Sequence, residues 1–247
     1  MSGDINKHWF EDWFDSPYYH ILYKKHSCSE AELFIDNLIH FLKPESKAEF
    51  LDLACGKGRH SIYLNKKGYK VTGMDLSQES ISYASKFENE KLNFFVQDMR
   101  KINQVNKFNY IMNLFTSFGY FENEADDFET IKNLSKALRP NGIFVLDFMN
   151  VKKVLSNLVP AEIKMSGGIE FTVTRTLENN FIIKRIHFSD NGQEYNFQER
   201  VKAISLNEFE KYFTAGGLKI IHLRGSYNLE EFNPETSDRL IIFAQKE

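Results

Sequence analysis

The sequence predicts an α/β fold built around a doubly wound, mostly parallel β-sheet. From about residue 46 onward, short apolar segments that are typical of buried strands alternate with segments of helical spacing. This alternation is typical of parallel strands joined by helices that cover both faces of a sheet. The last two strand-like segments have no helix between them, which predicts an antiparallel hairpin at the sheet edge.

Five strands and three helices are expected between residues 46 and 150. The strands are 49–54, 70–75, 93–98, 108–115 and 142–149, and the helices between them are 58–67, 77–89 and 123–138. Ser77 is a good N-cap for the second of these helices, and Arg139-Pro140-Asn141-Gly142 is typical of a helix end. Because each crossover contains a helix, consecutive strands are expected to run parallel.

The C-terminal part of the chain is expected to complete this sheet. A helix is expected to begin near Leu206, followed by strands at 219–225 and 240–246 with a polar loop containing Pro234 between them. Between the fifth strand and this helix, a segment of about 55 residues breaks the alternation, which is too long for an ordinary connection. The segment is therefore expected to form structure of its own.

That segment predicts a small antiparallel β-meander. Asp190-Asn191-Gly192 is a tight-turn signal between two alternating stretches. The apolar residues that alternate with polar ones are Ile169, Phe171, Val173, Leu177, Tyr195, Phe197, Val201 and Ala203.

The first 45 residues contain HWFEDWFDSPYYHILYKK and AELFIDNLIHFL, which predict helices packed on the edge or mouth of the sheet. We expect a single domain over residues 1–247. Its parts are an N-terminal helical cap at 1–45, a core at 46–150 and 205–247, and a β insertion at 151–204. The insertion is interpreted as a lid over a substrate.

Composition excludes several classes of function. The net charge of −3 and the isolated pairs Lys24-Lys25 and Lys66-Lys67 argue against a nucleic-acid-binding surface. No apolar run approaches the ~18 residues of a membrane span, and the N-terminus has no secretory signal, so a cytoplasmic protein is expected. Only Cys28 and Cys55 are present, too few for a disulfide framework or a structural zinc site, and no metal is expected.

The segment FLDLACGKGRHS at 50–61 runs from a strand into a helix through Gly56 and Gly58. Glycines allow the backbone to approach a ligand closely, and the amide groups of the helix start point toward it. A plain strand-to-helix turn is the simpler interpretation of this pair alone. A nicotinamide dinucleotide site would favour G-x-G-x-x-G, but Ser61 occupies the third position.

Three acidic residues support a ligand site beside this turn. Asp52 lies in the first strand, Asp75 ends the second, and Asp98 ends the third. Acids commonly end strands and are simply solvated there. In a parallel sheet, however, the carboxyl ends of neighbouring strands converge on one crevice, where such folds bind ligands.

These motifs resemble the class I S-adenosylmethionine-dependent methyltransferases, which have a Rossmann-like fold. The resemblance covers most of residues 46–150 and the C-terminal hairpin. The family's first motif, acidic-x-Gly-x-Gly-x-Gly, is matched by Asp52-Leu53-Ala54-Cys55-Gly56-Lys57-Gly58, with Ala54 in place of the first glycine. The acids at the ends of the second and third strands match its other two signals.

The resemblance implies S-adenosyl-L-methionine as cofactor and S-adenosyl-L-homocysteine as product. It implies that Asp75 accepts from the ribose hydroxyls, that Asp98 accepts from the adenine amino group, and that Asp52 lies near the charged end of the methionine moiety. The cofactor-binding residues that it implies are Asp52, Ala54, Gly56, Gly58, Asp75, Leu76, Asp98, Met99 and Leu114.

The acceptor side is less defined. No general base is evident, and the candidate catalytic residues are His20, Tyr19 and Tyr120. By resemblance to family members with N-terminal extensions, the aromatic segment can fold over the cofactor. The expected acceptor pocket consists of Tyr18, Tyr19, His20, Phe118 and Tyr120.

After the fourth strand, Leu114 and Phe115 replace the two prolines found in nucleic-acid amino-methyltransferases of this superfamily, which argues against base methylation. The sequence therefore predicts methyl transfer to a small-molecule acceptor by in-line displacement. A sensor or scaffold that binds the cofactor without transfer, and a nicotinamide oxidoreductase, remain alternatives. Exposed strands leave a homodimer open.

Overall fold

The computed structural model describes residues 9–23 and 28–247 and divides into two compact units. The core unit consists of residues 28–154 and 204–247, and the meander unit consists of the described residues before 28 together with 155–203. Residues 1–8 and 24–27, which belong to the predicted N-terminal cap and include Lys24-Lys25, lie outside the described residues.

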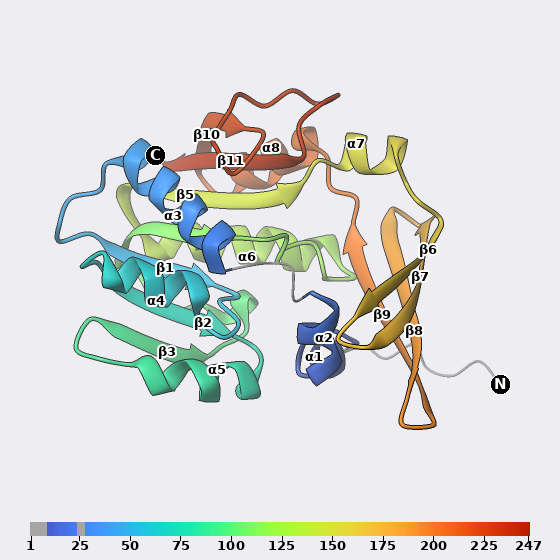
Figure 1. Cartoon of the computed structure of the whole chain (residues 1–247). Coiled ribbons are helices and arrows are strands. Elements are labelled where there is room, and N and C mark those ends of the chain that lie inside the picture. Colours follow the sequence, from blue (N-terminus) through green and yellow to red (C-terminus); the bar gives the residue numbers. More distant parts are fainter. Residues whose placement is uncertain (1–8, 24–27) are drawn as a thin grey trace. The chain divides into compact units, whose positions relative to one another are not determined.

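The core unit is built on a mostly parallel sheet with an antiparallel edge, which confirms the predicted fold class (Figure 1). Its seven described strands have the order β10-β11-β5-β4-β1-β2-β3. Strands β1 to β5 run parallel, whereas β11 pairs antiparallel with β5 and β10 pairs antiparallel with β11. The bounds are β1 Glu49–Leu53, β2 Lys70–Asp75, β3 Leu92–Val96, β4 Phe108–Asn113, β5 Leu138–Met149, β10 Leu218–Arg224 and β11 Arg239–Lys246.

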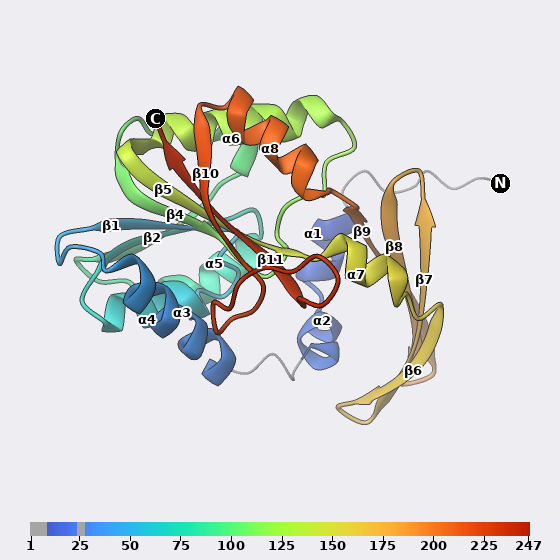
Figure 2. The ribbon, with the colours of Figure 1, turned by 90° about the horizontal axis from the view of Figure 1, so that it is seen from above.

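Helices cover both faces of this sheet, as expected for a doubly wound fold. In Figure 2, α3, α4 and α5 lie on one face, and α6 and α8 lie on the other. The bounds are α3 Cys28–Leu42, α4 Arg59–Lys66, α5 Gln78–Ala84, α6 Glu124–Ala137 and α8 Leu206–Ala215, with short 3-10 turns η1 Ser85–Phe87 and η2 Met99–Lys101. Helix α7, Val151–Ser156, follows β5.

The helix starts follow from local chemistry. Ser77 caps α5 by accepting a hydrogen bond from the Ser80 amide at 2.9 Å, as the sequence predicts. Ser205 and Glu208 form a capping box at the start of α8. Central strands such as β1 are almost completely buried because helices pack on both sides of them.

The boundary between α6 and β5 differs from the prediction. Helix α6 ends at Ala137 and β5 begins at Leu138, so the predicted helix-ending residues 139–142 lie inside the strand. They form an irregular segment in which Asn141 has a φ of 62° and the β4–β5 register shifts between Phe108 and Tyr110. The turn-forming residues therefore distort the start of β5 without ending it, because Leu138 before them and Ile143 after them both pair with β4.

The meander unit contains a four-stranded antiparallel sheet of order β6-β7-β8-β9. Its strands are β6 Ala161–Ser166, β7 Ile169–Glu178, β8 Phe181–Asp190 and β9 Gln193–Lys202. Asn191 and Gly192 form the predicted turn with φ values of 50° and 76°. A second such turn at Asn179-Asn180, with φ values of 49° and 65°, creates a hairpin that the apolar alternation alone did not reveal.

The first two helices, α1 Trp9–Phe14 and α2 Pro17–Leu22, belong to the meander unit. The buried Trp13 ring lies 4.7 Å from the Phe197 ring, and its indole N–H donates to Glu199 Oε1 at 2.8 Å. The Tyr18 ring lies 4.6 Å from Phe188. The predicted helical cap is thus divided, with α3 in the core unit and α1 and α2 on the meander sheet, because their aromatic side chains match its apolar face.

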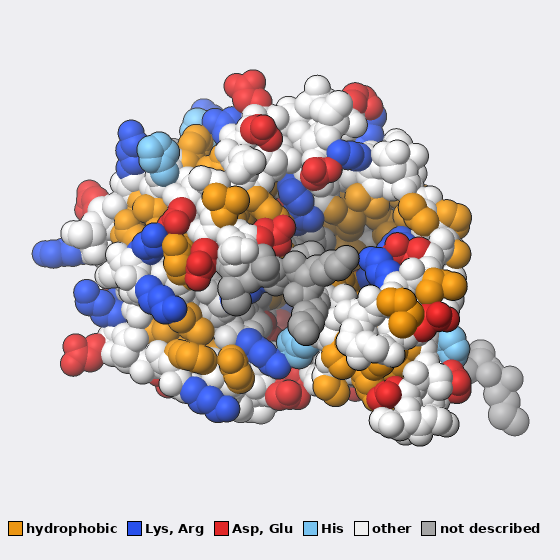
Figure 3. All heavy atoms as spheres, viewed as in Figure 1, with side chains coloured by type: hydrophobic (Ala, Val, Ile, Leu, Met, Phe, Trp, Pro, Cys, Tyr) orange, Lys and Arg blue, Asp and Glu red, His pale blue; other side chains and the backbone are white. Residues whose placement is uncertain are grey.

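The face of the molecule drawn in Figure 3 has no single dominant charge. On the face drawn in Figure 3, acidic and basic side chains are interspersed, in keeping with the net charge of −3. None of the helices in the described part of the chain has the length and apolar character needed to cross a membrane.

Candidate functional site

The turn between β1 and α4 is organised around a buried carboxylate. Asp52 is 1% exposed, and its Oδ2 accepts a hydrogen bond from the Ser61 hydroxyl at 2.6 Å. Burial raises the pKa of Asp52 to about 6, even though the Ser61 hydrogen bond favours the ionised form. The strand and the helix that flank the turn are therefore tied together beneath it.

The backbone of this turn lies in conformations that favour glycine. Ala54, Gly56 and Gly58 have φ values of 58°, 54° and 80°. A Cβ atom at Gly58 would lie 2.8 Å from the Phe94 ring, whereas one at Gly56 would meet nothing within 4 Å. Open space therefore lies beside Gly56, on the side from which a ligand can approach the backbone. Ala54 adopts its left-handed conformation without the freedom of a glycine.

Asp75, at the end of β2, connects the turn to the next helix. Its Oδ2 accepts from the Gly56 amide at 2.7 Å, and its Oδ1 accepts from the Ser77 amide at 2.8 Å. The carboxylate thus holds the backbone of the turn and the start of α5 at the same time. Asp75 is half-buried, and the neighbouring Leu76 is exposed, so both are accessible at the strand end.

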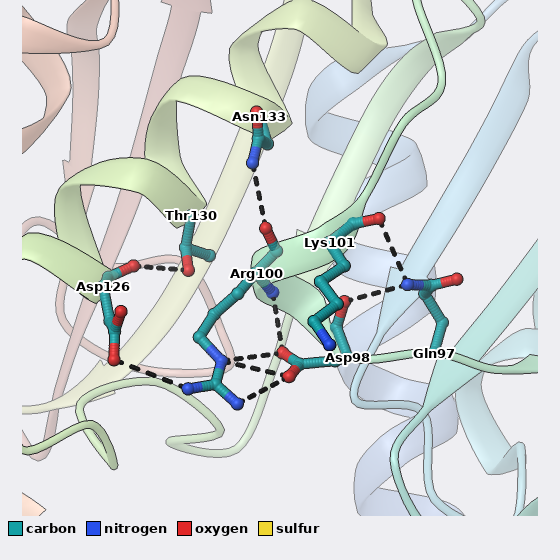
Figure 4. Close-up of polar contacts among 7 residues, drawn as sticks. All are labelled: Gln97, Asp98, Arg100, Lys101, Asp126, Thr130 and Asn133. Carbon is teal, nitrogen blue, oxygen red and sulfur yellow. Dashed lines mark hydrogen bonds and ion pairs between the residues drawn. The ribbon is translucent and has the colours of Figure 1, made fainter.

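Asp98 lies two residues beyond β3 and caps η2. Its carboxylate accepts from the Arg100 amide at 2.9 Å and from the guanidinium Nε and NH2 of Arg100 at 3.0 and 2.6 Å (Figure 4). Burial acts to raise the pKa of Asp98, but the hydrogen bonds from Arg100 outweigh it and the pKa is lowered. The half-buried Met99 lies between Asp98 and Arg100 in the sequence and begins η2.

The chain after β4 is strained and tightly held. Phe115 and Thr116 both have a φ of 59°, which is uncommon for residues with a side chain. The Phe115 amide donates to Asp147 Oδ2 at 2.8 Å, and the Thr116 amide donates to the Asp147 backbone oxygen at 3.0 Å. Strain of this kind persists only where surrounding contacts enforce it, and it is typical of functional sites.

Asp147 is the centre of a buried polar cluster that also contains Arg239 and Tyr227. Asp147 is fully buried, and its Oδ1 accepts from Arg239 Nε at 2.7 Å. Arg239 also donates to Thr116 Oγ1 at 2.8 Å, and the Tyr227 hydroxyl donates to Asp147 Oδ2 at 3.2 Å. Burial and the Asp147 charge raise the pKa of Tyr227, so its hydroxyl stays protonated. This cluster holds the segment after β4 against β5 and β11.

Two buried polar atoms, one at the start of α4 and one at the end of β4, have no hydrogen-bond partner among the described residues. They are Nε2 of His60 and Oδ1 of Asn113. Asn113 donates its amide to the Leu53 backbone oxygen at 3.0 Å, and the His60 ring lies 5.2 Å from the Phe115 ring. Burial lowers the pKa of His60 to about 3, so the ring is neutral at physiological pH.

The expected acceptor residues fall in both units. Phe118 is 1% exposed and packs near Phe209, so it is a core residue, and Leu114 is buried as well. The Tyr120 hydroxyl donates to the Thr116 backbone oxygen at 2.6 Å in the core unit. The other three candidates, Tyr18, Tyr19 and His20, belong to α2 in the meander unit.

Within the meander unit, these three residues are placed differently. The Tyr18 hydroxyl donates to Asp190 Oδ2 at 2.9 Å, and its hydrogen bonds raise its pKa. The half-buried Tyr19 ring packs edge-on against Trp13, and His20 is exposed. Tyr18 therefore has a clear role in holding α2 on the meander sheet.

Sequence reasoning missed Arg100, Asp147 and Arg239. The last two had a signal, since a charge next to or within a buried apolar strand such as GIFVLDFM or RLIIFAQK requires a partner of opposite charge. The identity of that partner has no local signal. Arg100 follows Asp98 at the two-residue spacing typical of side-chain-to-backbone turns.

Other site types find little support in the described residues. In 9–23 and 28–247, no group of three or more His, Cys, Asp or Glu side chains is placed to hold a metal ion. A hollow of about 300 Å³ lies at α8 and β10, where it is lined by Thr214, Leu218 and Glu247 among others. Leu218 of β10 pairs with Lys246 of β11. Gln245, the residue before Lys246, pairs with Ile143 near the start of β5. The hollow therefore lies near the amino ends of the parallel strands, whereas the acids lie at their carboxyl ends.

Known proteins match the sequence of this region and share the fold of the chain. The family model described as "Methyltransferase domain" matches residues 50–142, which contain the turn, all three acids and the segment after β4. This domain, together with the methyltransferase relatives and the solved structures below, supports the assignment of the chain to the class I S-adenosylmethionine-dependent methyltransferases. Its methyl donor is thus S-adenosylmethionine, and the nicotinamide alternative is set aside.

Two relatives of this methyltransferase align over most of its length. YqeM of Bacillus subtilis (strain 168), which is named as a methyltransferase without an acceptor, is 28% identical and covers 81% of this chain and 85% of its own. The dTDP-3-amino-3,4,6-trideoxy-alpha-D-glucopyranose N,N-dimethyltransferase of Streptomyces venezuelae is 26% identical and covers 77% of this chain and 83% of its own.

The fold of the methyltransferase also has solved counterparts. The crystal structure of an S-adenosylmethionine-dependent methyltransferase from Clostridium acetobutylicum ATCC 824 superposes with a TM-score of 0.78 at 22% identity. It covers 93% of this chain and 96% of its own. The fold is therefore shared with that protein.

Proposed function

We propose that the carboxyl ends of β1, β2 and β3 hold S-adenosylmethionine, with Asp75 at the ribose, Asp98 at the adenine and Asp52 near the methionine ammonium. The observation that carries this proposal is the open space beside Gly56, whose amide donates to Asp75, at the ends of the neighbouring strands β1, β2 and β3. The half-buried Asp75 carboxylate at the end of β2 is an acceptor, which suits the hydroxyl donors of a diol. The proposed binding residues are Asp52, Ala54, Gly56, Gly58, Asp75, Leu76, Asp98, Met99 and Leu114.

The unpartnered atoms beside the turn support the same placement. Asn113 Oδ1 and His60 Nε2 are buried polar atoms that need a partner, and each lies on an element that adjoins the turn. A bound group with both donors and acceptors would satisfy them, since an unmet buried polar group is costly. The residues present therefore fit a polar, zwitterionic ligand better than an apolar one.

The chemistry requires positioning above all. When bound, S-adenosylmethionine supplies a methyl group that is already activated on a sulfonium. The residues of the turn hold their ligand through backbone contacts, and the Asp147 cluster fixes the segment after β4 beside it. Holding the acceptor in line accounts for most of the catalytic advantage in such reactions.

The acceptor is a small molecule, and we infer that the methylated atom is an amine nitrogen. A neutral amine attacks with its own lone pair and loses its proton to solvent after the bond forms, so it needs no strong base at the site. The neutral, buried His60 fits that requirement. The name of the S. venezuelae relative specifies a nucleotide-linked amino sugar, which makes that chemical class the first to test.

The test has a binding arm and a transfer arm. Calorimetry should detect S-adenosylhomocysteine binding, and labelled S-adenosylmethionine should methylate a dTDP-linked 3-amino sugar but not the matching 3-hydroxy sugar. Methylation of the hydroxy sugar alone would contradict the amine assignment. Tight NADH binding without S-adenosylhomocysteine binding would contradict the cofactor site.

The remaining expectations from the sequence stay predictions. They are the lid role of residues 151–204, catalytic roles for His20, Tyr19 and Tyr120, a homodimer, and a cytoplasmic location, which the buried free thiol of Cys55 favours. For His20, replacement with Asn should lower the turnover of an amine acceptor less than tenfold, whereas loss of a general base costs about 10²-fold or more.

A further inference from the structure

Arg100 is the main partner of the Asp98 carboxylate. The guanidinium meets it side-on, with Nε 3.0 Å from both oxygens and NH2 2.6 Å from Oδ2, while the Arg100 amide donates to Oδ1 (Figure 4). A planar guanidinium matches a carboxylate in this bidentate geometry and limits its rotation. Asp98 is therefore held in one orientation by a residue only two positions away.

The hydrogen bonds leave capacity for one more donor. A carboxylate has about four acceptor positions. Three N–H groups, the amide, Nε–H and one NH2 hydrogen of Arg100, occupy the carboxylate of Asp98. One acceptor position thus remains on a carboxylate that Arg100 keeps ionised and oriented. This suits a single additional N–H donor.

The other side of Arg100 is anchored to α6 and the segment before it. Its NH1 lies 3.5 Å from Asp126 Oδ2, and its guanidinium carbon lies 5.0 Å from the centroid of the Phe121 ring. The backbone oxygen of Arg100 accepts from the Asn133 side chain at 2.9 Å. These contacts hold the guanidinium between Asp98 and the chain that leads from β4 into α6 (Figure 4).

The adjacent Lys101 makes none of these contacts. It carries the same charge and lies in the same 3-10 turn, but it is exposed, and only its backbone takes part in the hydrogen bonds drawn in Figure 4. It therefore separates the effect of a nearby positive charge from the effect of a bidentate hydrogen bond. The chain thus contains a matched control one residue away.

We propose that Arg100 is a positioning residue that aims the Asp98 carboxylate at the adenine amino group and thereby sets the preference for an adenine over a purine with a carbonyl at the same position. This inference rests on the proposed cofactor site. Arg100 itself does not contact the ligand. An oriented carboxylate accepts from an amino group and repels a carbonyl oxygen, whereas a freely rotating one loses much of this discrimination.

The experiment compares the affinities of S-adenosylhomocysteine and S-inosylhomocysteine by calorimetry for the parent, Arg100→Met, Arg100→Lys and Lys101→Met. For the parent we expect a preference for the adenosyl ligand of about tenfold or more, the worth of one charge-assisted hydrogen bond. In Arg100→Met, adenosyl binding should weaken about tenfold while inosyl binding changes less than about twofold. Lys101→Met should keep the parent's preference, and Arg100→Lys should lie between.

A purely structural role predicts a different pattern. If Arg100→Met weakens both ligands equally, or leaves the preference unchanged, the proposal is overturned. If the parent binds neither ligand, the proposed cofactor site is rejected, and the Arg100 proposal that rests on it is rejected with it. Should Arg100→Met not fold, as judged by circular dichroism, the same criterion applies to Arg100→Lys, in which an unchanged preference rejects the proposal.

Discussion

The two halves of the carboxyl edge of the parallel sheet hold their acids in different ways. At β1 and β2, the partners are close in sequence: Asp52 accepts from Ser61, nine residues away, and Asp75 accepts from Gly56, nineteen residues away. These contacts stay within one strand–helix–strand unit. The sequence motif that contains them is therefore sufficient to indicate the site.

At β4, β5 and β11, the partners are distant in sequence. Asp147 accepts from the Phe115 amide across 32 residues, from Tyr227 across 80 and from Arg239 across 92. The cluster requires both the parallel crossover and the antiparallel hairpin to be in place. The half at β1 and β2 is therefore a local motif, whereas the half at β4, β5 and β11 is a product of tertiary assembly.

The largest effect is expected where a distant partner is removed from a buried charge. Arg239→Met leaves the fully buried Asp147 carboxylate without its cation and should lower the free energy of unfolding by about 3–5 kcal/mol in urea denaturation. The control is Lys152→Met, which breaks an exposed pair with Glu235 and should cost less than about 1 kcal/mol. Equal losses in the two variants would remove the contrast between the two halves of the edge.

A second, smaller effect should appear in ligand binding instead of stability. Asp75→Ala removes the proposed acceptor for the ribose hydroxyls, and because charge-assisted hydrogen bonds contribute about 1.5–3 kcal/mol each, affinity for S-adenosylhomocysteine should fall at least about tenfold. The loss should be greater if the Gly56 turn also loosens. Calorimetry with Glu90→Ala, an exposed acid of the core unit, as control measures this. Unchanged affinity in Asp75→Ala would reject the ribose assignment.

The pH dependence of stability sharpens the comparison further. The pKa of Asp52 is raised from its usual value near 4 to about 6 in the fold, so its contribution to stability is complete below about pH 4 and is lost as the pH rises through 6. Asp52→Asn should therefore be more stable than the parent at pH 8, by on the order of 2 kcal/mol, with little gain at pH 4. The expected cost is weaker ligand binding.

Thermal melting as a function of pH provides the measurement. Titration of His60, whose pKa is lowered to about 3, acts equally in both proteins and cancels in the difference. A constant difference between Asp52→Asn and the parent from pH 4 to pH 8 would contradict the assigned pKa.

The smallest effect is expected at the alanine of the turn. Ala54 has a φ of 58°, a conformation that costs a residue with a Cβ about 1–2 kcal/mol. Ala54→Gly relieves that strain but adds about 0.4–1 kcal/mol of unfolded-state entropy, so stability should rise by no more than about 1.6 kcal/mol. A clear loss of stability in chemical denaturation would mean that the Ala54 side chain has a packing role that outweighs its strain.

The sequence alone determined the parallel core, the antiparallel hairpin, the glycine turn and the acids at the strand ends. These features depend on hydrophobic periodicity, turn chemistry and capping, which act within a few residues of one another. The same local rules indicated the meander and its Asp190-Asn191-Gly192 turn. They could not indicate which sheet the N-terminal helices would join.

Only the tertiary structure decided the choice of distant partners. It placed α1 and α2 on the meander sheet through Trp13 and Tyr18, and it paired Asp147 with Arg239. An amphipathic helix specifies an apolar face, and a buried charge specifies the sign of its partner, but neither specifies the position in the chain from which that partner comes. That position is set by chain topology, because only the assembled sheet brings residues 92 positions apart within hydrogen-bonding distance.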